Sequence, residues 1–563
     1  MIMISDFELW KNHPGLPIDY RRELDELDEL SRREAFATNI EFGTGGMRGI
    51  MGVGTNRINE YTIKWATMGL ACFVVSRSCG PFKVAIAYDT RGDSKRFARV
   101  AAQTLGSYGI VAYLFKEPRP TPELSYAVRR LKAQAGIVIT ASHNPPIYNG
   151  YKIYDSQGCQ FIPDLADRVS ELMQGESDYL SRVLPSYEDL LSAGTIVEID
   201  HEIDDPYLDF LTTLSPKSNN DGSFKIVYTP LHGTGAAFGA LLLEKLGYEV
   251  HTVMAQMVPD PLFATVASPN PEDKRAFILA EELGHKINAT LLMATDPDAD
   301  RLGIAVWSQG QYRYLSGALL GALLLDYILK TRPSTQDDVL ITTIVTPTLG
   351  QMIAKAHGID VILTLTGFKF IGDQIARLPP SKRFLFGYEE SYGFLFSGEV
   401  RDKDAFQGMA IASEMFAHYH KKKIDIGEVI ASLYLTYGYF VDELLSYELR
   451  GLDGLATINR VMKSLRKQAA TLFRDLKIHT YEDYLFSSGI DSKGRSYVLR
   501  LPVSDVVRLL GDHGSIVFRP SGTEPKLKVY LSFHYEDETE AKRMALLAKS
   551  IIDRFVKGFT ENE

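Results

Sequence analysis

The stretch "GIVITASHNPPIYNGYKIY", residues 136–154, contains the pattern that predicts the fold: an apolar run, GIVI, ends abruptly in a polar loop, TASHNP. The same change recurs along the chain, with helical patterns between the runs. The other runs are FKVAIAY before Asp89, FKIVYT before Pro230, ATLLMAT before Asp296 and DVLITTIV before Thr346. Strands that alternate with helices predict βαβ units and mainly parallel sheets. Ligands of such sheets gather outside the carboxyl ends of the strands, so the polar loops are the expected place for a site.

Length and composition indicate a chain of several domains. It has 563 residues, beyond the size at which a single hydrophobic core keeps growing. Hydrophobic residues make up 45% and charged residues 23%, which is typical of soluble globular proteins. The net charge of −10 argues against a nucleic-acid backbone as partner, because that affinity depends on Lys and Arg neutralising phosphates.

Cysteine usage and hydropathy favour a cytoplasmic location and no membrane contact. The three cysteines, Cys72, Cys79 and Cys159, have no CxxC spacing and cannot make a disulfide framework, which fits a reducing compartment. The N-terminus lacks the basic region and apolar core of a secretory signal. The most apolar stretch, residues 315–329, is too short to span a bilayer, and its spacing predicts a buried helix.

Changes of pattern along the chain suggest four parts. The first forty residues, with "RRELDELDELSRREAF", predict a charged amphipathic helical lead-in. From about residue 441 a helix-rich piece precedes two β runs around a Pro/Gly turn and a C-terminal helix, which predicts a separate α+β domain. The expected domains are 1–205, 206–314, 315–440 and 441–563.

Ser142 follows the apolar run of the opening stretch. A serine after a strand commonly caps a helix or closes a hydroxyl turn, and the functional alternative is a nucleophile or phosphate carrier. A hydrolase nucleophile elbow is excluded, because no glycine stands two residues before or after the serine. His143 is adjacent in sequence, which does not by itself place its ring on Ser142. A reactive serine requires a cation and a phosphate site nearby.

The acidic loop "DPDADR" supplies a candidate cation site. Asp296, Asp298 and Asp300 alternate after an apolar strand, and three such carboxylates repel one another unless a cation neutralises them. Oxygen-only ligands suit Mg²⁺ or Ca²⁺. An EF-hand loop is excluded, because Arg301 and Trp307 stand where it needs Gly and Glu. The alternatives are a polar loop that caps Arg301, or a phosphatase with an aspartyl nucleophile.

Two shorter stretches carry weaker signals. "EFGTGGMRG", residues 41–49, is a glycine-rich loop with Arg48, and it predicts either close backbone approach to an anion or a plain turn. "FGYEESYG", residues 386–393, follows an apolar run. If Glu389 and Ser391 alternate on a strand, both face one ligand, as sugar hydroxyls would require; the alternative is an exposed turn.

The stretch "RPSGTEPKLK", residues 519–528, is a local basic cluster in an acidic chain. Hydroxyls, a backbone turn and an arginine together can form an anion cradle, and the alternative is a hairpin loop. The residues that would form the cradle are Arg519, Ser521, Thr523, Lys526 and Lys528.

The five stretches occur together and in order, and in this the chain resembles the α-D-phosphohexomutase superfamily over about residues 40–535. "TASHNP" with "DPDADR" is highly specific. "FGYEESYG", together with "RDKDA" at 401–405 and "LTGFKFIG" at 365–372, looks most like the bacterial phosphoglucomutase/phosphomannomutase branch. The resemblance implies four domains around a central cleft: three α/β sandwich domains, carrying the phosphoserine, the metal and the sugar contacts in turn, and a smaller C-terminal α+β domain that binds phosphate.

The resemblance also implies a role for individual residues. It implies that Ser142 carries a phosphoryl group and that Mg²⁺ is held by Ser142 with Asp296, Asp298 and Asp300. It implies that the residues near the reacting oxygens are Arg48, His143, Lys152 and Lys369, with Lys369 first among the candidate general bases and Lys152 and His143 as alternatives. The implied substrate-binding residues are Arg301, Thr366, Gly367, Glu389, Ser391, Arg519, Ser521, Gly522 and Thr523.

The implied activity is the interconversion of glucose 1-phosphate and glucose 6-phosphate, with Mg²⁺ as cofactor and glucose 1,6-bisphosphate as intermediate and activator. A mannose-selective enzyme, a phosphopentomutase and a non-catalytic sugar-bisphosphate-binding protein are the alternatives. The expected partner is a small sugar phosphate, with no nucleic acid or membrane, and the expected state is a monomer or weak dimer. One departure from relatives is Ala318-Leu319, where a polar pair is common, and it puts local cleft contacts in doubt.

Overall fold

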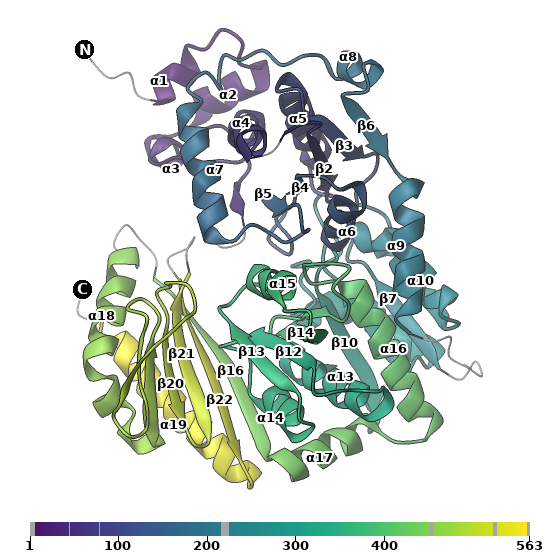
Figure 1. The fold of residues 1–563 in the computed structure, drawn as a ribbon, viewed down its shortest axis with the longest axis vertical. Helices are drawn as coiled ribbons and strands as arrows, with labels where there is room; N and C mark the ends of the chain where they lie inside the picture. The colour runs from purple at the N-terminus through teal and green to yellow at the C-terminus, as the bar shows by residue number, and fades with distance from the viewer. Residues whose placement is uncertain are drawn as a thin grey trace. The chain divides into compact units, whose positions relative to one another are not determined.

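The computed structural model describes residues 6–43, 46–77, 79–215, 224–449, 454–521 and 526–559 (Figure 1). The chain divides into two compact units, residues 1–320 with 367–423, and residues 321–366 with 424–563. These units cut across the predicted part 315–440, so the three predicted domain boundaries stay predictions. Among the described residues, no helix is both long enough and apolar enough to cross a membrane.

The first unit begins with three short helices, as the charged lead-in predicts. They are α1 (Asp6–Lys11), α2 (Ile18–Glu26) and α3 (Glu29–Phe36). Their polar residues face solvent, but Trp10, Tyr20 and Leu24 are buried in a cluster with Val53 and Tyr61. The lead-in is therefore amphipathic and packs onto the domain that follows it.

The serine-bearing domain is built on a six-stranded sheet of order β1-β5-β4-β2-β3-β6. Its strands are β1 (Met47–Ile50), β2 (Lys83–Tyr88), β3 (Val111–Phe115), β4 (Ala135–Ile139), β5 (Tyr148–Asp155) and β6 (Ile196–Ile199). Its helices are α4 (Glu60–Arg77), α5 (Ser94–Ser107), α6 (Thr121–Leu131), α7 (Pro163–Gly175) and α8 (Tyr187–Ser192). Strands β4, β2, β3 and β6 are parallel, whereas β1 and β5 run antiparallel to their neighbours.

Both faces of this sheet are covered, which explains the continuous apolar runs of its strands. Successive side chains of a strand point to opposite faces. Val84 and Ile86 of β2 pack in the core with α4, α5 and α7, whereas Ala85 and Ala87 pack in a second core with α6. The polar loops after β2 and β4 therefore lie at the same edge, the carboxyl end of the parallel strands.

The domain with the acidic loop is a five-stranded sheet of order β11-β10-β9-β7-β8. Its strands are β7 (Lys225–Thr229), β8 (Glu249–Thr252), β9 (Leu291–Thr295), β10 (Leu302–Ser308) and β11 (Gln311–Leu315). Its helices are α9 (His201–Thr213), η1 (Thr234–Ala237), α10 (Gly239–Lys245), α11 (Met254–Met257), η2 (Lys274–Phe277) and α12 (Ile278–Ile287). Strand β9 is parallel to β7 and antiparallel to β10, so the acidic loop joins two paired strands.

Residues 315–329 form the predicted buried helix, α13 (Gly317–Thr331), and Ala318 is buried in its first turn. The first unit ends with α15 (Phe368–Arg377), the hairpin of β14 (Arg383–Glu389) and β15 (Gly393–Leu395), and α16 (Ala405–Lys421). The carboxylate of Asp404 caps α16 by accepting bonds from the first free backbone N–H groups of the helix.

The second unit contains a parallel strand pair and an antiparallel sheet. The pair is β12 (Asp338–Thr343) and β13 (Asp360–Thr364), joined by α14 (Leu349–Ala356). After α17 (Ile426–Tyr437), the sheet contains β16 (Tyr439–Glu448), β17 (Ile478–Asp483), β18 (Ser488–Ile490), β19 (Ser496–Val498), β20 (Val507–Gly511), β21 (Gly514–Pro520) and β22 (Lys526–Tyr535). Helices α18 (Gly454–Leu472), η3 (Arg474–Leu476) and α19 (Glu538–Lys557) complete the unit, and α18 and α19 share one core with the sheet (Figure 1). The predicted C-terminal α+β pattern is confirmed.

Candidate active site

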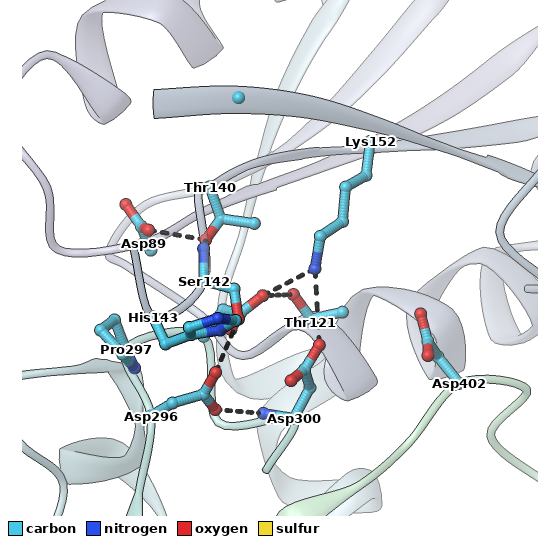
Figure 2. Close-up of polar contacts among 12 residues, drawn as sticks. Asp89, Thr121, Thr140, Ser142, His143, Lys152, Asp296, Pro297, Asp300 and Asp402 are labelled. Atoms are coloured by element: carbon cyan, nitrogen blue, oxygen red, sulfur yellow. Dashed lines mark hydrogen bonds and ion pairs between the residues drawn. The ribbon is translucent and has the colours of Figure 1, made fainter. Parts of the chain in front are cut away.

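Ser142 lies in the turn after β4 and is held there by a buried ion pair. Its φ of 52° is unusual for a residue with a side chain. Arg91 pairs with Asp89 at 3.1 Å, both side chains having no exposed surface, and its guanidinium donates to the carbonyls of Ser142 and Asn144. Thr140 donates its hydroxyl to Asp89 and accepts the amide of Ser142 at 2.8 Å (Figure 2). These bonds stabilise the strained turn.

The acidic loop brings its carboxylates to this serine. Ser142 Oγ donates to Asp296 Oδ2 at 2.7 Å, although 154 positions separate the two residues (Figure 2). The other oxygen of Asp296 accepts the backbone amides of Asp300 and Arg301 at 3.1 and 3.0 Å. Asp296, Asp298 and Asp300 are all buried, and one oxygen of each lies within 4.8 Å of the others. The structure thus joins the two motifs that the sequence analysis treated separately.

Two lysines contact the acidic loop, the buried Lys152 and the partly buried Lys403, and the sequence analysis did not identify Lys403 as a site residue. Lys152 Nζ on β5 lies 2.8 Å from Asp298 Oδ2 and 3.4 Å from Asp300 Oδ2. Lys403 Nζ lies 2.7 Å from Asp300 Oδ2. Lys403 belongs to the "RDKDA" stretch that contributes to the resemblance. Its position between Asp402 and Asp404 was the sequence feature that could have indicated a lysine among carboxylates. Both ammonium groups offset the charge of the loop.

The carboxylates of the loop fit a divalent cation. Asp298 Oδ1 and Asp300 Oδ1 are buried and have no hydrogen-bond partner among the described residues, whereas the Oδ2 atoms of the same side chains are bonded to lysines. Unpaired buried oxygens are costly, and hard cations such as Mg²⁺ prefer oxygen ligands. The acidic triad is therefore a candidate metal centre, and these two oxygens without a hydrogen bond are candidate ligands.

The pKa values of the site depend on these neighbours. Burial raises the pKa of Asp296 well above its usual value, and the charges of Asp298 and Asp300 raise it further. Burial also acts to raise the pKa of Asp298, but its neighbours, chiefly Lys152 and Lys403, together outweigh it and hold that pKa below the usual range. Burial acts to lower the pKa of Lys152, yet Asp298 and Asp300 raise it overall. A general base that works near neutral pH needs a lowered lysine pKa, and the carboxylates around Lys152 have the opposite effect.

His143 and the nearby arginines line the same loop. His143 Nδ1 lies 3.2 Å from Ser142 Oγ, so the ring does reach the serine. Burial lowers the pKa of His143 well below its usual value, and the charges of Arg301 and Arg48 lower it further. Arg48 on β1 donates to Asn144 Oδ1 at 3.1 Å, and Arg301 forms an ion pair with Glu272.

The predicted sugar-binding stretch forms a hairpin, in which Glu389 lies on a strand and Ser391 lies in the turn. Glu389 is the last residue of β14 and is buried, and its Oε1 accepts the amide of Gly367 at 2.8 Å. Ser391 lies in the turn between β14 and β15, so the argument from strand alternation is wrong for it. Thr366 Oγ1 is buried with no hydrogen-bond partner among the described residues. The roles of all four residues stay predictions.

The remaining predicted residues lie in the C-terminal hairpin, in the glycine-rich loop and on α15. Arg519 lies on β21, and the amide of Ser521 donates to the carbonyl of Lys526 at 2.7 Å, which agrees with a hairpin. Gly522 and Thr523 lie outside the described residues, as do Thr44 and Gly45 of the glycine-rich loop. Lys369 in the first turn of α15 is buried, with Nζ 5.3 Å from the centroid of the Phe370 ring. Its role as general base also stays a prediction.

Comparison with known proteins gives consistent matches between residues 39 and 550. Residues 39–180, 205–309 and 316–437 match the family descriptions "Phosphoglucomutase/phosphomannomutase, alpha/beta/alpha domain I", "domain II" and "domain III". Residues 457–550 match the C-terminal domain of the same family. The phosphoglucomutase of Staphylococcus aureus strain MRSA252 is 36% identical over 538 residues, which cover 94% of this chain and 96% of the relative. That of strain USA300 is 36% identical over 533 residues, covering 94% and 95%.

Solved structures support the same fold. A putative phosphomannomutase from Thermus thermophilus superposes with a TM-score of 0.65 at 20% identity, covering 92% of this chain and 99% of its own. The phosphoglucomutase parafusin from Paramecium gives a TM-score of 0.67 at 18% identity, covering 93% and 96%. At these identities the likeness concerns the fold alone, and it confirms the predicted fold class.

Proposed function

The chain belongs to the phosphoglucomutase/phosphomannomutase family and is a mutase, and from this premise we propose that it interconverts glucose 1-phosphate and glucose 6-phosphate. The observation that carries the proposal is the contact between Ser142 Oγ and Asp296 Oδ2 at 2.7 Å, inside a buried acidic triad. A hydroxyl beside a candidate metal centre suits a residue that accepts and returns a phosphoryl group.

In the proposed reaction, Ser142 begins as phosphoserine. A hydroxyl of the bound sugar phosphate attacks the phosphorus, the bond to Ser142 Oγ breaks, and a base takes the proton of the attacking hydroxyl. The product is glucose 1,6-bisphosphate. The bisphosphate then reorients, so that its other phosphate faces Ser142. Ser142 Oγ attacks that phosphorus and the bond from the phosphorus to the sugar oxygen breaks. This step releases the isomeric monophosphate and restores phosphoserine. Free glucose 1,6-bisphosphate would phosphorylate a bare Ser142 and so activate the enzyme.

The charges around Ser142 support this chemistry. Phosphoserine carries a charge of about −1.5 to −2 near neutral pH, which repels an attacking oxygen. Mg²⁺, held by Ser142 with Asp296, Asp298 and Asp300, would supply Lewis-acid polarisation of the phosphoryl oxygens. Arg48 and Arg301 add positive charge at the same loop. We propose Lys369 and His143 as candidate bases ahead of Lys152, whose pKa is raised by the neighbouring carboxylates. His143 is the candidate whose ring contacts Ser142 Oγ.

Substrate choice is proposed to depend on Glu389. The Gly367 amide holds one oxygen of this buried carboxylate, which fixes its orientation. A carboxylate that accepts two adjacent hydroxyls suits the 3- and 4-positions, which glucose and mannose share. A pentose phosphate has a shorter span between its phosphate positions and fits less well. We therefore expect wild-type kcat/KM to fall in the order glucose 1-phosphate, mannose 1-phosphate, ribose 1-phosphate.

Changing Glu389 to Gln is expected to lower kcat/KM for both hexose phosphates by roughly ten- to a hundredfold, because a hydrogen bond to a charged group is lost. Phosphorylation of Ser142 by glucose 1,6-bisphosphate should persist in part. The measurement is steady-state kinetics with Mg²⁺, a trace of glucose 1,6-bisphosphate and each of the three 1-phosphates. Glu428→Gln, on the exposed side of α17, is the control and should leave all three values unchanged. A wild type that prefers ribose 1-phosphate would make the protein a phosphopentomutase.

Changing Asp298 to Asn is expected to raise the Mg²⁺ concentration for half-maximal activity by about ten- to a hundredfold, because one anionic ligand is lost. The fold should persist, since the amide oxygen can still accept the bonds of Lys152 and Thr121. The measurement is a Mg²⁺ titration of activity. Asp167→Asn on the exposed surface of α7 is the matched control. An unchanged Mg²⁺ dependence in Asp298→Asn would exclude the acidic loop as the metal site.

A further inference from the structure

A threonine outside the predicted site contacts the acidic loop directly. Thr121 is the first residue of α6 and has no exposed surface. Its backbone amide donates to the carbonyl of Asp298 at 3.0 Å, and its hydroxyl donates to Asp298 Oδ2 at 2.9 Å (Figure 2). One residue therefore holds both the main chain and the side chain of Asp298, across 177 positions of sequence.

These bonds decide which oxygen of Asp298 remains available. Oδ2 accepts from Thr121 and from Lys152 at 2.8 Å, whereas the buried Oδ1 has no hydrogen-bond partner among the described residues. Lys152 also contacts Asp300 Oδ2, so its ammonium is shared between two carboxylates. Among the described residues of the acidic loop, the Thr121 hydroxyl bonds to one side chain, that of Asp298. Its bond therefore concerns this carboxylate alone, whereas the ammonium of Lys152 is shared.

The segment that carries Thr121 also has anchors outside the acidic loop. Arg119, two residues before Thr121, donates its amide to the carbonyl of Tyr88 at 3.0 Å. Its guanidinium donates to both oxygens of Asp204 on α9, at 3.0 and 2.6 Å, and to Asp200 at 3.2 Å. Prolines on either side of Thr121, at 120 and 122, restrict the backbone further. The segment that carries Thr121 is thus held by residues outside the acidic loop.

We propose that Thr121 is a positioning residue of the metal centre, whose hydroxyl turns the Asp298 carboxylate so that Oδ1 faces the bound cation. This inference rests on the proposed function, in which the acidic triad binds Mg²⁺. In this proposal Thr121 acts on the cation through Asp298, the residue that it contacts. A purely structural role at the start of α6 would instead make Thr121 matter for stability and leave metal affinity unchanged.

The test compares Mg²⁺ binding in variants that differ by one hydroxyl. Thr121→Val keeps the shape of the side chain and removes the donor, and Thr121→Ser keeps the donor. Thr104→Val is the matched control, because Thr104 is equally buried but donates to Val100 within α5. Each chelator-treated protein, brought to the same Ser142 phosphorylation state as judged by intact mass, is titrated with MgCl₂ by calorimetry. The shift of Tm on addition of MgCl₂ is measured in parallel.

We expect Thr121→Val to raise the Kd for Mg²⁺ by about tenfold or more, the effect of losing a hydrogen bond to a charged group. Its Tm shift with MgCl₂ should fall accordingly, while Thr121→Ser and Thr104→Val bind as the wild type does. Equal Kd values in Thr121→Val and the wild type would overturn the inference. So would a serine variant that binds as weakly as the valine variant, and this comparison stands even if Thr121→Val folds poorly. A wild type that binds Mg²⁺ at other residues, with Asp298→Asn unaffected, overturns the metal assignment first and the inference with it.

Discussion

Replacing Ser142 by alanine is expected to lower the rate of isomerisation by at least about a thousandfold, because the group that carries the phosphoryl is lost. No neighbour can replace it. His143, whose partly buried ring lies 3.2 Å from Ser142 Oγ, is also a nucleophile in principle, but it is Ser142 Oγ that bonds to Asp296 at the acidic triad. The fold should be retained, since the turn is held by Arg91 and Thr140 through backbone atoms of residue 142.

Two measurements check this prediction. Coupled kinetics with glucose 1-phosphate give the rate, and intact mass gives the phosphorylation state. The wild type incubated with glucose 1,6-bisphosphate should contain a fraction heavier by one phosphate, and Ser142→Ala should not. Ser170→Ala on α7, whose hydroxyl bonds only within its own helix, is the control and should match the wild type in both. Near-normal turnover in Ser142→Ala would contradict the phosphoserine mechanism.

Replacing Arg91 by leucine is expected to lower the free energy of unfolding by about 3–5 kcal/mol, because it leaves Asp89 as an unpaired buried charge. Both side chains of this pair have no exposed surface. The same change removes the donors to the carbonyls of Ser142 and Asn144, so the serine shifts from its place beside Asp296. A displacement of about 1 Å at reacting atoms can cost about a hundredfold in rate, and we expect a loss of at least that size.

Denaturant unfolding and kinetics at a temperature where the variant is folded separate the two effects of Arg91→Leu. The double variant Asp89→Leu with Arg91→Leu removes both buried charges, so it should recover part of the stability but not the activity. Arg168→Leu on α7 is the control, because Arg168 is 62% exposed and pairs only with Glu171 in the next turn. Recovery of activity together with stability in the double variant would show that the ion pair does not position the serine.

Individual strands and helices could be predicted from the sequence, because their patterns involve residues that are close together in the chain. The apolar runs before Asp89, Ser142 and Asp296 are strands β2, β4 and β9, as their composition predicts. The stretch 315–329 is a buried helix for the same reason. The alternation argument for Ser391 was wrong, because a strand ends where the chain turns, and the turn at 390–392 interrupts the period. Patterns of this kind do not show where a strand stops.

By itself the sequence determined the chemistry that is available: a serine after a strand, three closely spaced carboxylates and a local basic cluster. The residues of each feature lie within a few positions of one another, so covalent connectivity alone keeps each feature together. Only the tertiary structure decided which of them meet. Ser142 meets Asp296 over 154 positions, Thr121 meets Asp298 over 177, and Lys403 meets Asp300 over 103. Such contacts depend on how buried faces of separate sheets pack, which no short motif encodes. The charges of Asp298 and Asp300, brought to Lys152 by this packing, raise the pKa of Lys152 against the effect of burial.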